Sequence, residues 1–282
     1  MRVRSAKIRR VSRFVRPSFY WIRSLVEFVY PPICPACEKR FDGLVPICRP
    51  CLKALKSALS VARQSGKCDF SQLSDPPFFD AVFTGWDYTP ELESLIHLVK
   101  YQGMKRLGFF LGKLAGRTFP ADWNLSLHSA DNVPRCDRPG KESVRGGAFS
   151  MEETGREGGI LVPIPLHRVR KRERGYNQSE WIARGLSEEL KIPVRASVLR
   201  RNRQTRTQTK LTAVERERNV RGAFHVLDPL AVKGRTVFLV DDVITTGATL
   251  NACAECLKNA GVVSVVGLAL ARPVKKWKEG AG

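Results

Sequence analysis

The stretch "LVDDVITTGAT", residues 239–249, places two adjacent acids, Asp241 and Asp242, at the end of an apolar run. Like charges side by side repel each other and raise each other's pKa. A loop of threonines with a single glycine follows at once. A buried strand that ends in a doubled acid needs a ligand, a cation or a solvated turn to balance the charge.

The segments around this stretch alternate between strand and helix patterns. "GILVPIP", residues 159–165, and "VVSVVGLALA", residues 262–271, are apolar strands like 236–240. Helical spacing lies between them, at Ile182, Leu186 and Leu190 and again from Thr249. This alternation with all-apolar strands predicts an α/β fold, a parallel sheet covered by helices on both faces. Ligands in such folds bind beyond the carboxyl ends of the strands, where the acid pair lies.

The predicted domain extends toward the N-terminus. Residues 78–88 form a partly alternating strand, after which Thr89 is expected to cap a helix whose first residue is Pro90. Residues 120–158 lack periodicity and are expected to be a mobile insertion. The basic segment 166–179 is expected to be a turn, and the polar, basic segment 199–220 an exposed, mobile excursion. We therefore predict a basic arm with an amphipathic segment at 1–29, a metal knuckle at 30–58 and the α/β domain at 78–273.

Positive charge is concentrated in two segments of the 282-residue chain. The net charge is +21, of which residues 1–30 contribute +7 and residues 166–221 contribute +10. Apolar content of 43% and charged content of 27% are ordinary for a globular protein. Charge gathered in this way favours a polyanionic partner such as a phosphate or a nucleic acid, although a solvated basic surface explains the N-terminal arm equally well.

Four cysteines near the N-terminus have the spacing of a metal site. Cys34 and Cys37 form one C-x2-C pair, and Cys48 and Cys51 form a second pair ten residues later. Two such pairs can close a tetrahedron of thiolates around one structural zinc. A pair of disulfides and a rubredoxin-like iron site are the alternatives.

The other cysteines are not assigned to a metal. Cys253 falls on the apolar stripe of the helix after the acid pair, whereas Cys256 lies off that stripe, and Cys68 and Cys136 lie in loop-like sequence. Cysteines without a recognisable signal peptide point to reduced thiols and a cytoplasmic location. No stretch of the sequence approaches the 18 apolar residues of a membrane span.

The loop after the acid pair has the composition of a phosphate cradle. A helix that begins there directs its positive end and its backbone N–H groups toward an anion. Thr245, Thr246 and Thr249 add hydroxyl donors, and Gly247 permits close approach of the backbone. Acids just before the cradle can accept hydrogen bonds from sugar hydroxyls or hold magnesium indirectly. A ribose 5-phosphate satisfies both halves of the stretch, whereas a generic turn needs neither.

This pattern resembles the phosphoribosyl-pyrophosphate (PRPP) motif of type I phosphoribosyltransferases. Four further features resemble the ComF-type competence proteins: "VPIPLHRVRKRERGYNQS", R-x-T-x-T-Q-x-x-L at 203–211, R-x-x-N-V-R-G-A-F at 216–224 and the cysteine knuckle. The resemblance covers most of residues 30–273, apart from the insertion. The basic arm before residue 20 is unusual for that family.

The resemblance implies roles for particular residues. Asp241 and Asp242 would be the catalytic pair that contacts the ribose hydroxyls. Arg203, Arg206 and Lys210 would neutralise charge from a flexible hood at 200–219 that closes over PRPP. The 5-phosphate would be held by Thr245, Thr246, Gly247, Ala248 and Thr249. The pyrophosphate would be faced by Leu166, His167 and Arg168.

Two functions follow from the resemblance. One is a phosphoribosyltransferase that displaces pyrophosphate from PRPP with the help of magnesium. The other is a non-catalytic protein on the same fold, which binds single-stranded DNA during DNA uptake or senses PRPP without turnover. The partners implied are PRPP, single-stranded DNA and other DNA-uptake proteins. Tyr20, Trp21 and Tyr176 are candidates to stack on bases or, alternatively, to lie at the edge of the core.

Overall fold

The structure is a computed structural model that describes residues 32–41, 45–62, 73, 77–119, 158–203 and 213–272. The basic arm, nearly all of the insertion at 120–158, and Tyr20, Trp21, Cys68, Cys136, Arg206 and Lys210 lie outside these residues. The described helices are α2 (Arg49–Ala62), α3 (Pro90–Tyr101), α4 (Lys105–Gly116), α6 (Arg168–Arg174), α7 (Gln178–Leu190), α8 (Ala213–Val220) and α9 (Ala248–Asn259). The strands are β1 (Ala81–Asp87), β2 (Ile160–Pro163), β3 (Leu199–Arg201), β4 (Phe224–Val226), β5 (Thr236–Val243) and β6 (Ser264–Arg272).

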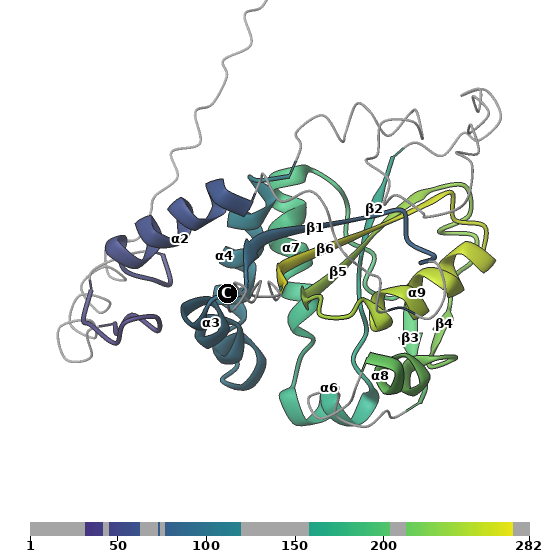
Figure 1. Ribbon diagram of the computed structural model, residues 1–282, viewed down its shortest axis with the longest axis horizontal. Helices are drawn as coiled ribbons and strands as arrows, with labels where there is room; N and C mark the ends of the chain where they lie inside the picture. The colour runs from purple at the N-terminus through teal and green to yellow at the C-terminus, as the bar shows by residue number, and fades with distance from the viewer. Residues whose placement is uncertain are drawn as a thin grey trace, which may run out of the picture.

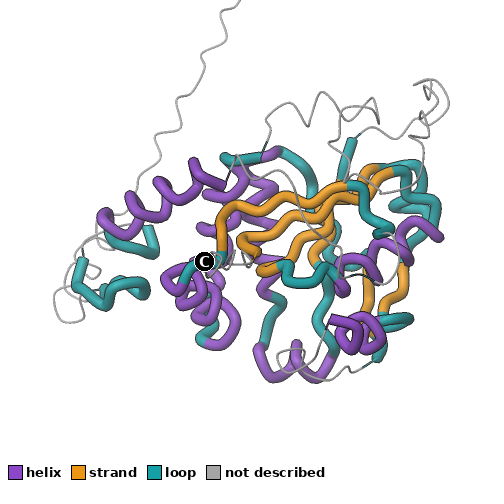
Figure 2. The backbone as a smooth tube through the Cα atoms, viewed as in Figure 1, coloured by secondary structure: helices purple, strands orange, loops and turns teal. Residues whose placement is uncertain are grey.

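The centre of the molecule is a parallel sheet of four strands in the order β1-β6-β5-β2 (Figures 1 and 2). β3 and β4 form a separate antiparallel pair. All four residues of β2 are buried, as are eight of the nine residues of β6. Strands of this kind must be covered on both faces, so the predicted parallel α/β fold is confirmed.

Helices cover the two faces of the sheet, α4 and α7 on one side and α9 on the other (Figure 1). Side chains of β5 alternate between the two faces. Phe238 and Val240 belong to the core beneath α3, α4 and α7, whereas Val237 and Leu239 belong to the core beneath α9. This period of two is what a strand imposes, and it decides where the acids that follow are directed.

The helices α4 and α7 are in close contact. A Cβ atom added to Gly112 would lie 2.2 Å from the backbone oxygen of Ile182, and one added to Gly185 would lie 2.0 Å from that of Phe109. These two glycines therefore let the helix backbones touch. The contact holds α7 against the sheet and sets the position of its N-terminus beside β5.

Three sequence predictions about local structure need correction. The basic segment after β2 is not a turn but the helix α6, in which none of the seven residues is buried, so an apolar stripe could not reveal it. The segment 199–220, predicted to be an exposed excursion, contains β3 and α8 at its two ends. β5 continues through both acids to Val243, so the acid pair belongs to the strand rather than to the loop.

Candidate functional site

Asp241 and Asp242 lie near the end of β5, and their side chains differ in exposure. Asp242 is only 5% exposed, whereas Asp241 is partly accessible. Asp241 pairs in register with Ala269 of the neighbouring strand β6. The end of β2 lies on the other side of β5, where the N–H of Ile164 donates to the oxygen of Val240 at 2.9 Å. Loops from two strands therefore meet the acids at one edge of the sheet.

Among the described residues, only one of the two carboxylate oxygens of Asp242 has a partner. Its Oδ1 lies 3.0 Å from Nζ of Lys100, which comes from the end of α3. Its Oδ2 is buried and finds no hydrogen-bond partner among the described residues. Burial opposes ionisation of Lys100, but the nearby charges of Asp242 and Asp241 outweigh it and raise the pKa of this lysine. A buried acceptor that lacks a donor is costly, so Oδ2 could accept a hydrogen bond from a ligand.

Asp241 is held by hydrogen bonds within the protein. Its Oδ1 accepts from Oγ of Ser179 at 3.1 Å and from the backbone N–H of Asp242 at 2.8 Å. Burial, together with the adjacent charge of Asp242, nevertheless raises the pKa of Asp241 to about 7. The pair therefore differs in its chemistry, since Asp242 has a cationic partner and Asp241 has neutral donors.

The loop that follows has the backbone expected of a phosphate cradle. Gly247 adopts φ 78°, a left-handed conformation that glycine tolerates best, and α9 begins at the next residue. The N–H of Ala248 approaches Oγ1 of Thr246 at 3.4 Å, and the N–H of Asn251 donates to the oxygen of Gly247 at 2.8 Å. A twelve-residue helix therefore begins, with its positive end, shortly after the acid pair in the chain.

The motif G-Y-N-Q-S, residues 175–179, ties three elements to this edge of the sheet. The hydroxyl of Tyr176 donates to the oxygen of Val99 at the end of α3. Asn177 donates to the oxygen of Ile164 at 3.0 Å and caps α7 by accepting from the N–H of Ser179. Ser179 in turn holds Asp241. All of Tyr176, Asn177 and Ser179 are buried. The motif is therefore the frame of the site, and Tyr176 is not available to stack on a base.

The residues assigned to the pyrophosphate and the hood residue Arg203 differ in their contacts. Leu166, His167 and Arg168 follow β2 at the edge where the acids lie, and His167 caps α6 by accepting from the N–H of Val169 at 3.4 Å. Arg203 is engaged within the protein, because its guanidinium donates to the oxygens of Asn219 and Arg221, each at 3.0 Å. In this conformation Arg203 therefore ties the end of α8 to the segment after β3.

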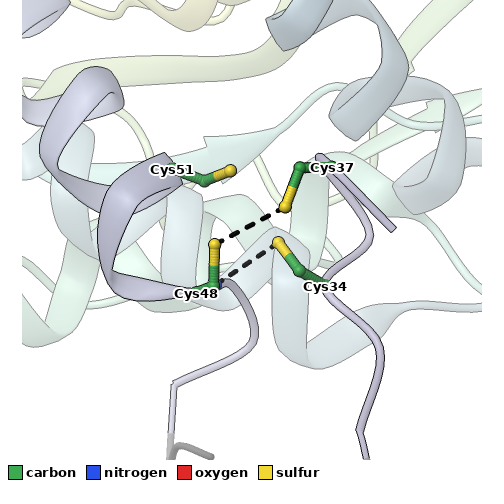
Figure 3. A group of neighbouring side chains, drawn as sticks. All are labelled: Cys34, Cys37, Cys48 and Cys51. Carbon is green, nitrogen blue, oxygen red and sulfur yellow. Dashed lines mark hydrogen bonds between the residues drawn. The ribbon is translucent and has the colours of Figure 1, made fainter. Parts of the chain in front are cut away.

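The four cysteines come together as predicted, with their thiols directed toward one another (Figure 3). All four sulfurs lie within 4.8 Å of one another. The first pair lies in a tight turn bridged by Ile33 and Arg40, and the second pair opens α2. The backbone N–H of Cys48 donates to Sγ of Cys34 at 3.3 Å. Although burial opposes ionisation, such donors lower the pKa of Cys34 to about 7. A set of four thiols at this spacing could bind zinc.

Cys253 and Cys256 behave as the sequence predicted. Cys253 is fully buried in the core beneath α9, and Cys256 is only partly buried. Within the described ranges, the N-terminal cysteines are the one group of His, Cys, Asp and Glu side chains close enough to share a metal ion.

Sequence reasoning missed Lys100, Asn177 and Ser179 as members of the site. Lys100 lies next to Val99 at the border of the buried stripe of α3, and a cation at such a border can turn toward the core. Ser179 lies two positions after a helix cap, which gave no sign of a partner 62 residues away. Their roles depend on contacts between segments that no local pattern encodes.

Comparison with known proteins identifies the domain. Residues 161–279 match the family described as the phosphoribosyl transferase domain. The chain is 28% identical to competence protein F of Haemophilus influenzae over 85% of this chain and 90% of that protein. It is 29% identical to the DNA utilization protein YhgH of Escherichia coli, over 88% and 94% of the two chains. It is 35% identical to competence protein ComFC of Bacillus subtilis, over 38% of this chain and 41% of that one.

The fold, the strand-to-helix site and the matched segment define a protein with a type I phosphoribosyltransferase-like domain, preceded by a four-cysteine cluster. The chain is similar over most of its length to the two longer relatives and carries that cluster, so it resembles the ComF-type competence proteins, as the sequence predicted. Among the residues that the structure describes, no helix is both long enough and apolar enough to cross a membrane.

Proposed function

We propose that this protein binds PRPP together with magnesium at the carboxyl end of β5, and that it acts as a phosphoribosyltransferase. The observation that carries this proposal is the buried carboxylate of Asp242, whose Oδ2 lacks a donor among the described residues, in a strand that is followed along the chain by the start of α9 at Ala248. A ligand with vicinal hydroxyls and a phosphate supplies both a donor for the acid and an anion for the helix.

The roles of the chain's residues follow from this assignment. Asp241 and Asp242 accept hydrogen bonds from the ribose hydroxyls, and residues 245–249 hold the 5-phosphate. The turn at residues 166–168 faces the pyrophosphate, which leaves the anomeric carbon as a nucleophilic acceptor forms its bond to that carbon. Asp241 and Asp242 would hold magnesium indirectly, and the metal would supply positive charge to the leaving pyrophosphate. Ser179 keeps the carboxyl group of Asp241 oriented throughout.

Calorimetric titration of PRPP with magnesium into the zinc-loaded protein tests the proposal. We expect binding by the wild type and a loss of at least ~10-fold in affinity for Asp241→Asn/Asp242→Asn. Asp228→Asn is the matched control, because Asp228 lies in an exposed turn before β5 and its Oδ1 accepts from Ala231 as an amide oxygen also can. Equal binding by the double variant would contradict the assignment.

Turnover is measured separately, by pyrophosphate release with candidate nucleobases as acceptors. Pyrophosphate release that requires both acceptor and magnesium supports the transferase. Binding without release keeps the ligand site but reduces the function to sensing of PRPP.

A second candidate function is the binding of single-stranded DNA, which the names of the competence and DNA utilization relatives suggest for this chain. A face where α3, α4, α6 and α7 meet favours it. Tyr101 is 60% exposed, with the guanidinium of Arg174 at 4.8 Å from its ring centre. Trp181 is partly exposed and lies between Lys105, at 5.9 Å, and Arg184, at 4.9 Å. Aromatic rings among cations are what sequence-tolerant single-strand binders use.

Fluorescence anisotropy with a labelled single-stranded oligonucleotide tests this second function. We expect an affinity that falls steeply as salt rises, and a further loss of about 1–3 kcal/mol for Tyr101→Ala or Trp181→Ala. Leu230→Ala is the control, because Leu230 is 67% exposed and does not belong to α3, α4, α6 or α7. Unchanged affinity in both aromatic variants would remove this face from the proposal.

A further inference from the structure

Resting on the proposed function, we infer that Lys100 is a positioning residue of the ribose site. The ammonium of Lys100 binds Oδ1 of Asp242 at 3.0 Å and so keeps that carboxylate oriented. The opposite oxygen, Oδ2, is left as the acceptor for a sugar hydroxyl. Lys100 acts through Asp242 and does not itself need to touch the ligand.

The burial of Asp242 makes a counter-ion necessary. A carboxylate that is 5% exposed loses most of its hydration, and an uncompensated buried charge is strongly destabilising. Asp241 has Ser179 and the N–H of Asp242 as donors, but Lys100 is the charged partner that the described residues offer to Asp242. Without Lys100, the carboxylate loses this contact and is expected to rotate, which removes the oriented acceptor.

A second lysine–aspartate ion pair, between Lys258 and Asp80, differs from the pair at Asp242 in the donors around its carboxylate. Lys258 binds Oδ2 of Asp80 at 2.8 Å, and the lysine side chains of the two pairs are similarly exposed, 26% and 25%. Oδ2 of Asp80 also accepts from Oγ of Ser264 at 3.1 Å and from the N–H of Val265 at 2.8 Å. The pair at Asp80 is thus a saturated structural contact, whereas the pair at Asp242 leaves a buried oxygen for another molecule.

Lys100 is held in place by the packing of α3. Thr89 caps the start of the helix, and Leu92, Leu95, Ile96 and Val99 are buried beneath it. At its end, the hydroxyl of Tyr176 donates to the oxygen of Val99, the residue before Lys100. Both ends of α3 are therefore anchored, which is the support that a positioning residue needs.

The inference extends the site beyond the matched domain. Lys100 lies in the chain well before residue 161, where the match to the phosphoribosyl transferase family begins. Residues 161–279 alone would lack the counter-ion of Asp242. The helix α3 is accordingly part of the ligand site and not only a cover for the sheet.

The test compares the ligands ribose 5-phosphate and inorganic phosphate on full-length, zinc-loaded variants, with affinities from ligand-detected NMR. We expect Lys100→Met to weaken ribose 5-phosphate binding at least ~10-fold and to change phosphate binding less than ~2-fold, and we expect Lys100→Arg to recover most of the loss. Lys258→Met is the matched control and should lower thermal stability without changing either affinity. Equal losses for the two ligands would mean that Lys100 only attracts anions, and would overturn the inference.

A second comparison decides the matter even if Lys100→Met folds poorly. In the Asp242→Asn background the partner of Lys100 is neutral, so adding Lys100→Met should change ribose 5-phosphate affinity less than ~2-fold. A further loss of ~5-fold or more would show that Lys100 contacts the ligand directly, which contradicts a positioning role. A wild type that binds neither PRPP nor ribose 5-phosphate overturns the proposed function and this inference together. Wild-type binding with an unaffected Lys100→Met variant overturns this inference alone.

Discussion

The indole N–H of Trp86 donates a hydrogen bond to the backbone oxygen of Leu55 at 2.9 Å. Leu55 belongs to α2, the helix that begins beside Cys48 and Cys51, and Trp86 belongs to the edge strand β1. The ring of Trp86 is buried, with 1% of the residue exposed. The cysteine cluster is therefore joined to the sheet through α2. Loss of a metal from the cluster should accordingly destabilise the α/β domain as well.

Removal of zinc is expected to destabilise the whole chain. Cys34→Ser should abolish one equivalent of bound zinc and lower the melting temperature by ~5–10 °C, because metal binding is coupled to folding in such clusters. Trp86 should report the change as a shift in tryptophan emission. Mass spectrometry measures the zinc content, and thermal melts measure the melting temperature. Cys256→Ser is the control and should keep its zinc, and equal zinc loss in both variants would contradict the assignment.

The glycine contact between α4 and α7 predicts a graded set of defects. Gly112→Ala and Gly185→Ala each place a methyl group against backbone atoms and should cost about 3 kcal/mol or more, since overpacked helix backbones must separate. Gly116→Ala meets side-chain atoms and no backbone, the nearest being the Cβ of Glu189 at 3.0 Å, and should cost far less. Urea unfolding of the three variants measures the order. Gly112→Ala as stable as Gly116→Ala would mean that the helices are not this close.

Tyr176→Phe tests the frame of the candidate site. It removes the donor to Val99 at the end of α3 and leaves a buried acceptor unsatisfied, so the free energy of unfolding should fall by about 1–3 kcal/mol. Ligand affinity should fall as well, because Lys100 follows Val99. Tyr101→Phe is the control on an exposed ring and should change stability by less than ~0.5 kcal/mol. Equal stabilities for the two variants would show that the hydroxyl of Tyr176 has no structural role.

The raised pKa of Asp241 predicts an unusual dependence of stability on pH. The pKa of this carboxyl group is about 7 in the folded chain, above its ordinary value of 3.8, so the native state binds more protons than the unfolded state between these values. This group's contribution to stability is therefore present at low pH and is lost as the pH rises toward 7, by at most ~1.4 kcal/mol per pH unit. Above that pH the contribution is constant.

Asp241→Asn isolates this contribution from other titrating groups. Urea unfolding of wild type and variant at pH 5.5, 6.5, 7.5 and 8.5 should show the variant gaining relative stability up to about pH 7.5 and no further. A constant difference across this range would show that Asp241 titrates normally.

Much of the site could be predicted because its signals are local in the sequence. The apolar run before Asp241, the single glycine at 247 and the two C-x2-C pairs each determine the conformation of a few consecutive residues. Thr89 and Pro90 likewise predicted the start of α3, where the N–H of Leu92 donates to Oγ1 of Thr89 at 3.4 Å. Where the local signal was charge without an apolar stripe, as in α6, the prediction of a turn was wrong.

By itself, the sequence determined the parallel α/β fold, the four-cysteine cluster and the position of the acid pair near the carboxyl end of a buried strand. Only the tertiary structure decided that Lys100 neutralises Asp242, that Ser179 holds Asp241 and that Tyr176 is a buried anchor. The physical reason is the range of the interactions. Hydrophobic periodicity and turn chemistry act between neighbours in the chain, whereas the partner of a buried charge is chosen by the packing of helices that are far apart in sequence.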